Sequence, residues 1–196
     1  MMKRQITRDD IMPMAEYAKV RAERRKALVE VKRNRRVPVG PYATFYFENY
    51  DTMWSQVHEM LFIERGGEGQ IADELGAYNP LIPQGAELVA TIMFEIDDPV
   101  RRKNLLNRLG GVEDTFYLEF ADGSRVQAVP EADVDRTSAS GKASSVQFAH
   151  FPFTAQQKAA FAQPGTRVIL GIGHENYAHM TVLPEAVRAE LAKDFD

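Results

Sequence analysis

The segment from residue 87 to residue 96, ELVATIMFEI, constrains the fold most, because its apolar side chains recur at every second position. The apolar set on one side of this alternation is Leu88, Ala90, Ile92, Phe94 and Ile96. Successive side chains of a β-strand point to opposite faces of the sheet, so a period of two indicates a strand. The segment therefore predicts a half-buried strand.

Other short segments carry strand signals of the same kind. Aromatic and β-branched residues gather at positions 42–48, and an Asp122-Gly123 turn separates two apolar runs in the manner of a hairpin. The further strands that we expect cover residues 42–48, 115–120, 125–129, 145–151, 167–172 and 180–183. Most of them lie after Gly85.

Helix signals dominate the first part of the chain. Thr7 resembles an N-cap followed by acids in the first turn, and predicts a helix whose body runs from about residue 12 to residue 32. Pro38 and Pro41 close this helix. Further helices are expected near residues 50–65, 70–77, 99–109, 154–163 and 184–195.

The order of these elements predicts the fold class. Helices lead and short strands follow, an order that favours an α+β fold over βαβ units. We expect N-terminal helices, then a mainly antiparallel sheet, and a C-terminal helix. The length of 196 residues favours a single domain over residues 1–196, with a basic helical segment at about 7–36 packed on it or projecting from it.

Positive charge is concentrated in that first segment. Residues 1–40 hold 12 Lys and Arg against 5 Asp and Glu, a net of +7, while the whole chain has a net charge of −4. The arginines that we predict to contact a partner are Arg24, Arg25, Arg33, Arg35 and Arg36. Such a run can collect phosphates or acidic groups, or it can be a solvated helix face or pack on the chain's own acidic remainder. The pI of 5.6 disfavours nucleic acid as the partner.

The chain contains no cysteine, which excludes disulfides, thiolate metal ligands and a cysteine nucleophile. No apolar run approaches the length of about 18 residues that a membrane span needs, and the first residues lack the apolar core of a secretory signal. We therefore expect a cytoplasmic protein without a membrane partner.

Four histidines suggest a metal site. The predicted ligands are His58, His150, His174 and His179, with Glu59 completing an N/O set suited to iron, zinc or manganese. The alternatives to Glu59 are Glu48, Glu64, Glu95 and Glu175. On its strand, His150 shares the apolar face of Val146 and Phe148, and a histidine that faces a core needs a hydrogen bond or a metal. The alternative is that each histidine is structural, because their spacing matches no standard zinc motif.

A polar loop suggests an anion site. The residues that would bind the anion are Arg136, Ser138, Ser140 and Lys142. Small residues expose backbone N–H groups there, and the two cations add positive charge. The loop is not a phosphate-binding P-loop, since Arg136 and Ala143 stand where glycine and a hydroxyl residue would be required. An ordinary surface loop is the alternative.

Three long blocks of the chain are TRDDIMPMAEYAKVRAERRKALVEVKRNRRVPVGPYATFYFENYDTMWSQVHEML, RTSASGKASSVQFAHFPF and HENYAHMTVLPEAVRAEL. With these blocks, the chain resembles a bacterial family of uncharacterised proteins, a domain-of-unknown-function family. The resemblance covers essentially the whole chain. It implies genes near those of rubrerythrin-like proteins and iron–sulfur oxidoreductases, and hence a role near redox or peroxide metabolism. It supplies no catalytic residues.

Two hypotheses of function remain open. The first is a cytoplasmic metal-binding protein, with iron, zinc or manganese as cofactor and a redox protein as partner. The second is a non-enzymatic adaptor that uses the basic helix and the anion loop, with a homodimer as one form of partnership. No nucleophile–base pair is recognisable, so the sequence does not decide whether the protein is an enzyme.

Overall fold

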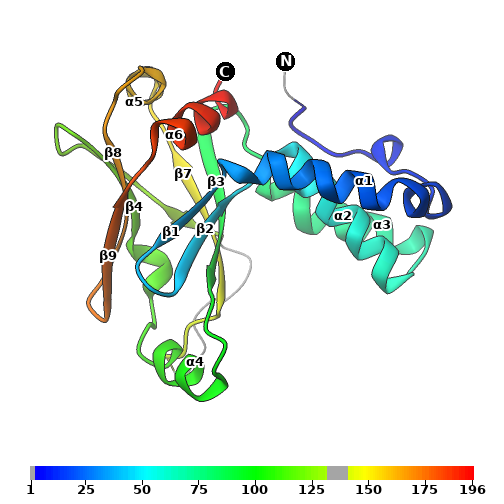
Figure 1. The fold of residues 1–196 in the computed structure, drawn as a ribbon, viewed down its shortest axis with the longest axis horizontal. Coiled ribbons are helices and arrows are strands. Elements are labelled where there is room, and N and C mark those ends of the chain that lie inside the picture. Colours follow the sequence, from blue (N-terminus) through cyan, green and yellow to red (C-terminus); the bar gives the residue numbers. More distant parts are fainter. Residues whose placement is uncertain (1–2, 132–140) are drawn as a thin grey trace.

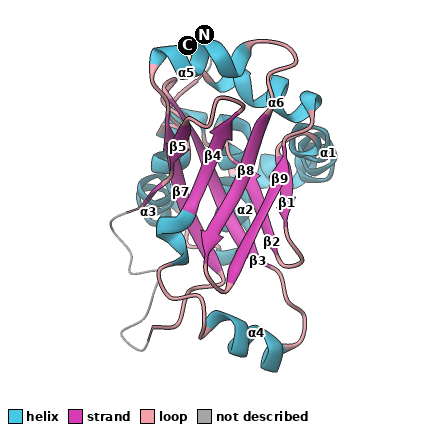
Figure 2. Cartoon of the chain, turned by 90° about the vertical axis from the view of Figure 1, so that its left-hand side faces the viewer, coloured by secondary structure: helices cyan, strands magenta, loops and turns pink. Residues whose placement is uncertain are grey.

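Two antiparallel sheets face each other at the centre of the molecule (Figures 1 and 2). The computed structural model describes residues 3–131 and 141–196. The five-stranded sheet has the order β1 (Arg36–Val39), β2 (Ala43–Phe47), β3 (Glu87–Phe94), β7 (Val146–Pro152) and β6 (Val129–Pro130). The four-stranded sheet has the order β5 (Arg125–Gln127), β4 (Phe116–Phe120), β8 (Val168–His174) and β9 (Tyr177–Val182).

Helices flank the sheets at three places (Figure 1). The helical layer, which extends away from the five-stranded sheet, comprises α1 (Met14–Arg33), α2 (Tyr50–Glu64) and α3 (Glu68–Tyr78). Helix α4 (Pro99–Leu106) lies at one end of the sheets, and α5 (Ala155–Ala162) and α6 (Glu185–Leu191) lie at the other. Short 3-10 turns are η1 (Arg8–Asp10), η2 (Asn79–Leu81), η3 (Val112–Thr115) and η4 (Ala192–Asp194). The predicted α+β class is confirmed.

The helices begin where capping side chains allow them to begin. The side chain of Asn49 accepts a hydrogen bond from the backbone N–H of Thr52 at the start of α2. The side chain of Asp98 accepts one from the backbone N–H of Arg101 at the start of α4. Thr154 and Gln157 form the predicted capping box of α5. Each cap satisfies backbone N–H groups that have no partner within the helix. Within the described residues, no helix is long and apolar enough to cross a membrane.

The main core lies between the two sheets. Leu88, Ala90 and Ile92 of β3 are fully buried there, as their alternation predicts. Across the core, the ring of Phe45 on β2 meets the ring of Phe116 on β4 edge to face, with 5.4 Å between centroids. Side chains from both inner faces therefore fill one continuous apolar layer.

A second core lies between the helical layer and the outer face of the five-stranded sheet. Val89 of β3 is fully buried in it, against a group that includes Met53, Val57 and Leu81. Strand β3 is therefore buried on both faces along most of its length, whereas its alternation predicts a half-buried strand. The reason is that the helices cover the face that the sequence pattern leaves for solvent.

The segment after α1 differs from the sequence prediction. Pro38 does not simply end the helix, because residues 36–39 form strand β1, in which Val37 and Val39 are buried. The strand lies at the edge of its sheet, where a proline without an N–H group is tolerated. The predicted N-cap Thr7 opens only the turn η1, and α1 begins after Pro13.

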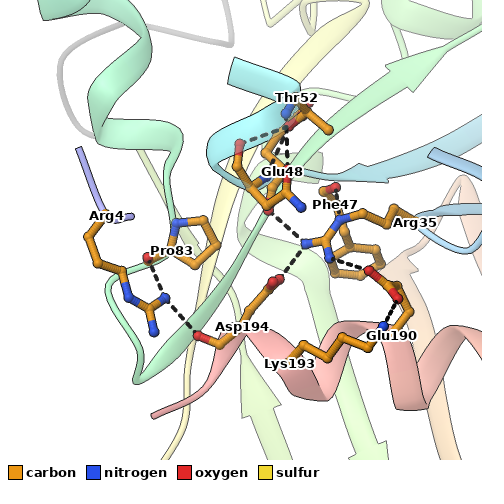
Figure 3. Close-up of polar contacts among 10 residues, drawn as sticks. Arg4, Arg35, Phe47, Glu48, Thr52, Pro83, Glu190, Lys193 and Asp194 are labelled. Atoms are coloured by element: carbon orange, nitrogen blue, oxygen red, sulfur yellow. Dashed lines mark hydrogen bonds and ion pairs between the residues drawn. The ribbon is translucent and has the colours of Figure 1, made fainter. Parts of the chain in front are cut away.

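A buried ion pair joins the turn between α1 and β1 to the C-terminal turn η4 (Figure 3). The guanidinium of Arg35 donates to the backbone carbonyls of Phe47 and Glu48, at 3.0 and 2.9 Å, and to the carboxylate of Asp194. Arg35 and Asp194 are only 2% and 1% exposed at their side chains. From the N-terminal segment, Arg4 donates to the carbonyl of Asp194 at 2.8 Å. This cluster fastens both ends of the described chain to the sheets.

Candidate functional site

His58 lies inside the helical layer, and its ring is fully buried. Its Nδ1 donates to the carbonyl of Trp54 at 2.7 Å, and its Nε2 accepts from the backbone N–H of Met12 at 3.1 Å. Burial lowers the pKa of His58, which keeps the ring neutral. Both ring nitrogens already have protein partners, so these contacts support the structural alternative for His58.

Glu59, which follows His58 on α2, anchors α1. Its carboxylate accepts from the hydroxyl of Tyr17 at 2.8 Å and from Nε and Nη2 of Arg21 at 2.8 and 2.7 Å. The hydrogen bonds from Arg21 lower the pKa of Glu59, while burial raises the pKa of Tyr17 to about 12. Both oxygens of this predicted metal ligand are used in holding two helices together.

His150 lies on the outer face of the five-stranded sheet, not in the core between the sheets. The core face of β7 carries Gln147, Ala149 and Phe151. Nδ1 of His150 lies 3.0 Å from Oε2 of Glu87 on the neighbouring strand. The contact with Glu87 raises the pKa of His150 and outweighs burial. The sequence pattern suggests a core position for His150. In the structure, its ring instead pairs with a carboxylate on the outer face of the sheet.

The two remaining histidines lie on the β8–β9 hairpin. Nε2 of His174 contacts the carbonyl of Gly110 at 3.2 Å, and its Nδ1 accepts from the backbone of Asn176 at 3.2 Å. The ring of His179 packs against Tyr177, 4.5 Å between centroids. Within residues 3–131 and 141–196, no three His, Asp or Glu side chains form a group that could hold a metal. The metal hypothesis gains no support from these contacts and stays a prediction.

The predicted anion loop is described only at its end. Arg136, Ser138 and Ser140 lie outside the described residues. Lys142 is exposed at the start of the segment that leads into β7. The anion site therefore stays a prediction.

Helix α1 presents a largely unburied surface. Of its 20 residues, only Tyr17 is buried. The helix carries 7 Lys and Arg and 3 Glu, a net charge of +4. Amphipathic helices of a folded protein usually bury a continuous apolar stripe. Because α1 lacks such a stripe, most of its surface is available to another molecule.

A groove runs between the second half of α1 and strands β1 and β2. We call it the basic groove; its volume is about 710 Å³, and it is lined by Arg25, Leu28, Val29, Lys32, Arg33, Arg36, Pro38, Thr44 and Tyr46. Four of these nine side chains are cationic and none is acidic. Val29 adds an apolar surface that is 64% exposed. The groove thus combines positive charge with the exposed aliphatic side chain of Val29.

The cations of the basic groove differ in how far they are neutralised. Arg33 pairs with Glu30 at 2.7 Å, and Arg36 lies 3.5 Å from Glu95. Arg25 and Lys32 form no ion pair with any described residue. These two side chains therefore supply net positive charge to the groove.

The aromatic wall of the basic groove is Tyr46. The guanidinium of Arg36 lies over its ring, 5.1 Å from the centroid, and its hydroxyl donates to Glu95 at 2.7 Å. Burial, together with Glu95, raises the pKa of Tyr46 to about 12, so the phenol stays protonated. A neutral phenol and a guanidinium thus share one wall of the groove.

Two of the predicted partner-binding arginines lie elsewhere. Arg24 packs over the ring of Trp54, 5.2 Å from its centroid, outside the groove. Arg35 is buried in its pair with Asp194, so a partner cannot reach it and its role is structural. The basic run does not indicate this burial, because the partner of Arg35, Asp194, lies 159 residues away in the sequence. Val29 and Lys32 also line the groove and do not belong to the predicted partner-binding set, although they lie four and seven residues after Arg25 on the same helix.

The fold and this surface define an α+β protein with a basic helical layer on a pair of antiparallel sheets. The chain belongs to the family described as "Protein of unknown function (DUF3501)", which matches residues 5–195. A crystal structure of a protein of unknown function from Burkholderia pseudomallei K96243 is similar over 98% of this chain and 100% of that chain, with 34% identity and a TM-score of 0.90. No curated protein matches the sequence. The genomic association with redox proteins stays a prediction.

Proposed function

We propose that this protein is a binding module whose basic groove docks an acidic, partly apolar segment of a partner protein. The observation that carries the proposal is a pair of groove cations, Arg25 and Lys32, that form no ion pair with any described residue and lie on either side of the exposed Val29. Carboxylates of the partner would pair with the cations, and an aliphatic side chain would cover Val29. The ion pairs would add charge-assisted hydrogen bonds, and covering Val29 would remove apolar surface from water.

The distribution of charge favours a protein segment over a nucleic acid. The chain as a whole has a net charge of −4, and residues 41–196 hold 12 Lys and Arg against 23 Asp and Glu, a net of −11. A long polyanion would meet repulsion outside the groove, whereas a short acidic segment would not. Helix α1 is about 30 Å long, which suits a segment of a few helical turns.

The test uses a fluorescein-labelled helical peptide with glutamates on one face and leucines on the other. We expect it to bind the full chain with an affinity that falls as salt rises, because Coulomb attraction is screened. The variant Arg25→Glu/Lys32→Glu should lose at least about tenfold in affinity, the equivalent of one charge-assisted contact. Fluorescence anisotropy measures both effects.

The matched control is Lys103→Glu/Arg167→Glu, which changes the net charge equally at two exposed residues outside the groove. It should retain affinity within about twofold. Equal losses in the two double variants would show non-specific attraction and overturn the proposal. Tighter, groove-dependent binding of a single-stranded RNA of similar length would overturn it in favour of a nucleic-acid partner.

A further inference from the structure

A second cavity lies between the helical layer and the outer face of the five-stranded sheet. Its volume is about 350 Å³, within the range of small-molecule sites. We call it the interlayer pocket; it is lined by Lys32, Tyr46, Glu48, Met53, Gln56, Tyr78, Leu81, Thr91, Met93, Val146 and Phe148. The lining contains one carboxylate and one ammonium group.

The carboxylate of the interlayer pocket is buried and only partly satisfied. Glu48 is 6% exposed, and its Oε1 accepts from the hydroxyl of Thr91 at 2.8 Å. No other hydrogen bond and no ion pair to this carboxylate occurs among the described residues. A buried carboxylate without a cation is costly, and a ligand with a positive charge removes that cost.

The backbone holds Glu48 in place on both sides. Its N–H donates to the carbonyl of Val89 at 2.8 Å. Its carbonyl accepts from Nη2 of Arg35 at 2.9 Å, as Figure 3 shows. The backbone of Glu48 is thus fixed before any ligand arrives, and Thr91 holds one carboxylate oxygen, which lowers the entropic cost of binding.

The cation of the pocket is Lys32, at the C-terminal end of α1. It is half-buried and forms no ion pair with Glu48 or with any other described residue. Two opposite charges therefore line one cavity without neutralising each other. Between them, Met53, Leu81 and Phe148 supply apolar wall.

From this arrangement we infer that the interlayer pocket binds a small zwitterion with an apolar body, of the size of an α-amino acid with a large apolar side chain. The ammonium group would contact Glu48, and the carboxylate would contact Lys32. The apolar side chain would lie against Met53 and Phe148. The hydroxyl of Tyr78 and the amide of Gln56, 3.5 Å apart, remain as adaptable polar groups at the wall.

The inference goes beyond the docking of a partner segment, although the two sites touch. Lys32 and Tyr46 line both the basic groove and the interlayer pocket, whereas Glu48 lines only the pocket. A change at Glu48 therefore tests the pocket alone. Failure of the peptide experiment would leave the pocket experiment unaffected.

The experiment is isothermal titration calorimetry of the full chain with L-phenylalanine, L-methionine and L-leucine. Two analogues dissect the charges: 3-phenylpropanoate lacks the ammonium group, and phenethylamine lacks the carboxylate. We expect at least one amino acid to bind, and its singly charged analogues to bind about tenfold more weakly or worse. No measurable binding of any of the three amino acids would overturn the inference.

Variants assign each charge to its residue. Glu48→Gln should abolish the preference for phenylalanine over 3-phenylpropanoate, and Lys32→Met should abolish the preference over phenethylamine. The control Glu23→Gln removes an exposed charge outside the pocket and should change neither preference. Near-ultraviolet circular dichroism verifies folding, and Lys32→Met serves alone if Glu48→Gln does not fold. Preferences that survive both pocket variants would place the ligand elsewhere and overturn the inference.

Discussion

The pair between Arg35 and Asp194 allows the sharpest test of the structure, through the variant Asp194→Asn. The substitution keeps the shape of the side chain and removes its charge. It leaves the guanidinium of Arg35, which is 2% exposed, with Glu190 as its one remaining acidic neighbour in the described chain, at 3.5 Å. Two backbone carbonyls continue to accept hydrogen bonds from it. The variant therefore isolates the cost of one buried charge.

The magnitude follows from that geometry. Removing one partner of a buried ion pair costs about 3–5 kcal/mol, and the contact with Glu190 places the expected loss at the low end, about 3 kcal/mol. For a chain of 196 residues this corresponds to a fall in Tm of roughly 6–12 °C. Urea unfolding measures the loss directly. The single tryptophan, Trp54, reports on the helical layer, and far-ultraviolet circular dichroism reports on the whole fold.

The control lies one residue away. Lys193→Met removes a partner of Glu190 that is 65% exposed, so its cost should stay within about 0.5 kcal/mol. A loss below about 1 kcal/mol for Asp194→Asn, comparable to that of the control, would refute the reasoning. It would show that Glu190 alone neutralises Arg35.

Three further predictions follow from the histidines. His58→Phe should lower the free energy of unfolding by about 2 kcal/mol in urea titrations, because the backbone N–H of Met12 loses its partner and the carbonyl of Trp54 loses one of its two. Glu87 raises the pKa of His150, so the protonated ring stabilises the fold fully below about pH 6.5, and that contribution is lost as the pH rises through the folded-state pKa. The loss of stability in His150→Gln should therefore be larger at about pH 5.5 than at about pH 8.5. Elemental analysis tests the metal hypothesis: near-stoichiometric iron, zinc or manganese that is lost in His150→Ala/His174→Ala would establish it, whereas trace metal and a Tm unchanged by EDTA would leave the histidines structural.

Local signals in the sequence predicted much of the fold. The alternation at 87–96 correctly identified the inner face of β3, and the caps at Asp98 and Thr154 correctly placed two helices. These features depend on backbone geometry within a few residues. The sequence patterns did not predict strand β1, because it is short, lies at the edge of its sheet and contains Pro38.

The sites depended on contacts that no local pattern contains. Arg35 stands in a basic run, and its burial is decided by Asp194, 159 residues away. The interlayer pocket unites Lys32 from one helix with Glu48 at the end of a strand, and neither belongs to a recognisable motif. Such residues are brought together by the arrangement of helices and strands in space, which no short segment of the sequence determines.

The sparse anchoring of α1 has a consequence for cooperativity. The helix is fastened mainly through Tyr17 and Arg21, in its first half, and its second half forms the wall of the basic groove. Regions with few buried contacts open with a free energy well below that of global unfolding. Native-state hydrogen exchange would therefore resolve the second half of α1 as a separate low-stability unit. A partner that binds there would suppress this local opening. Part of the intrinsic binding free energy would therefore stabilise the second half of α1.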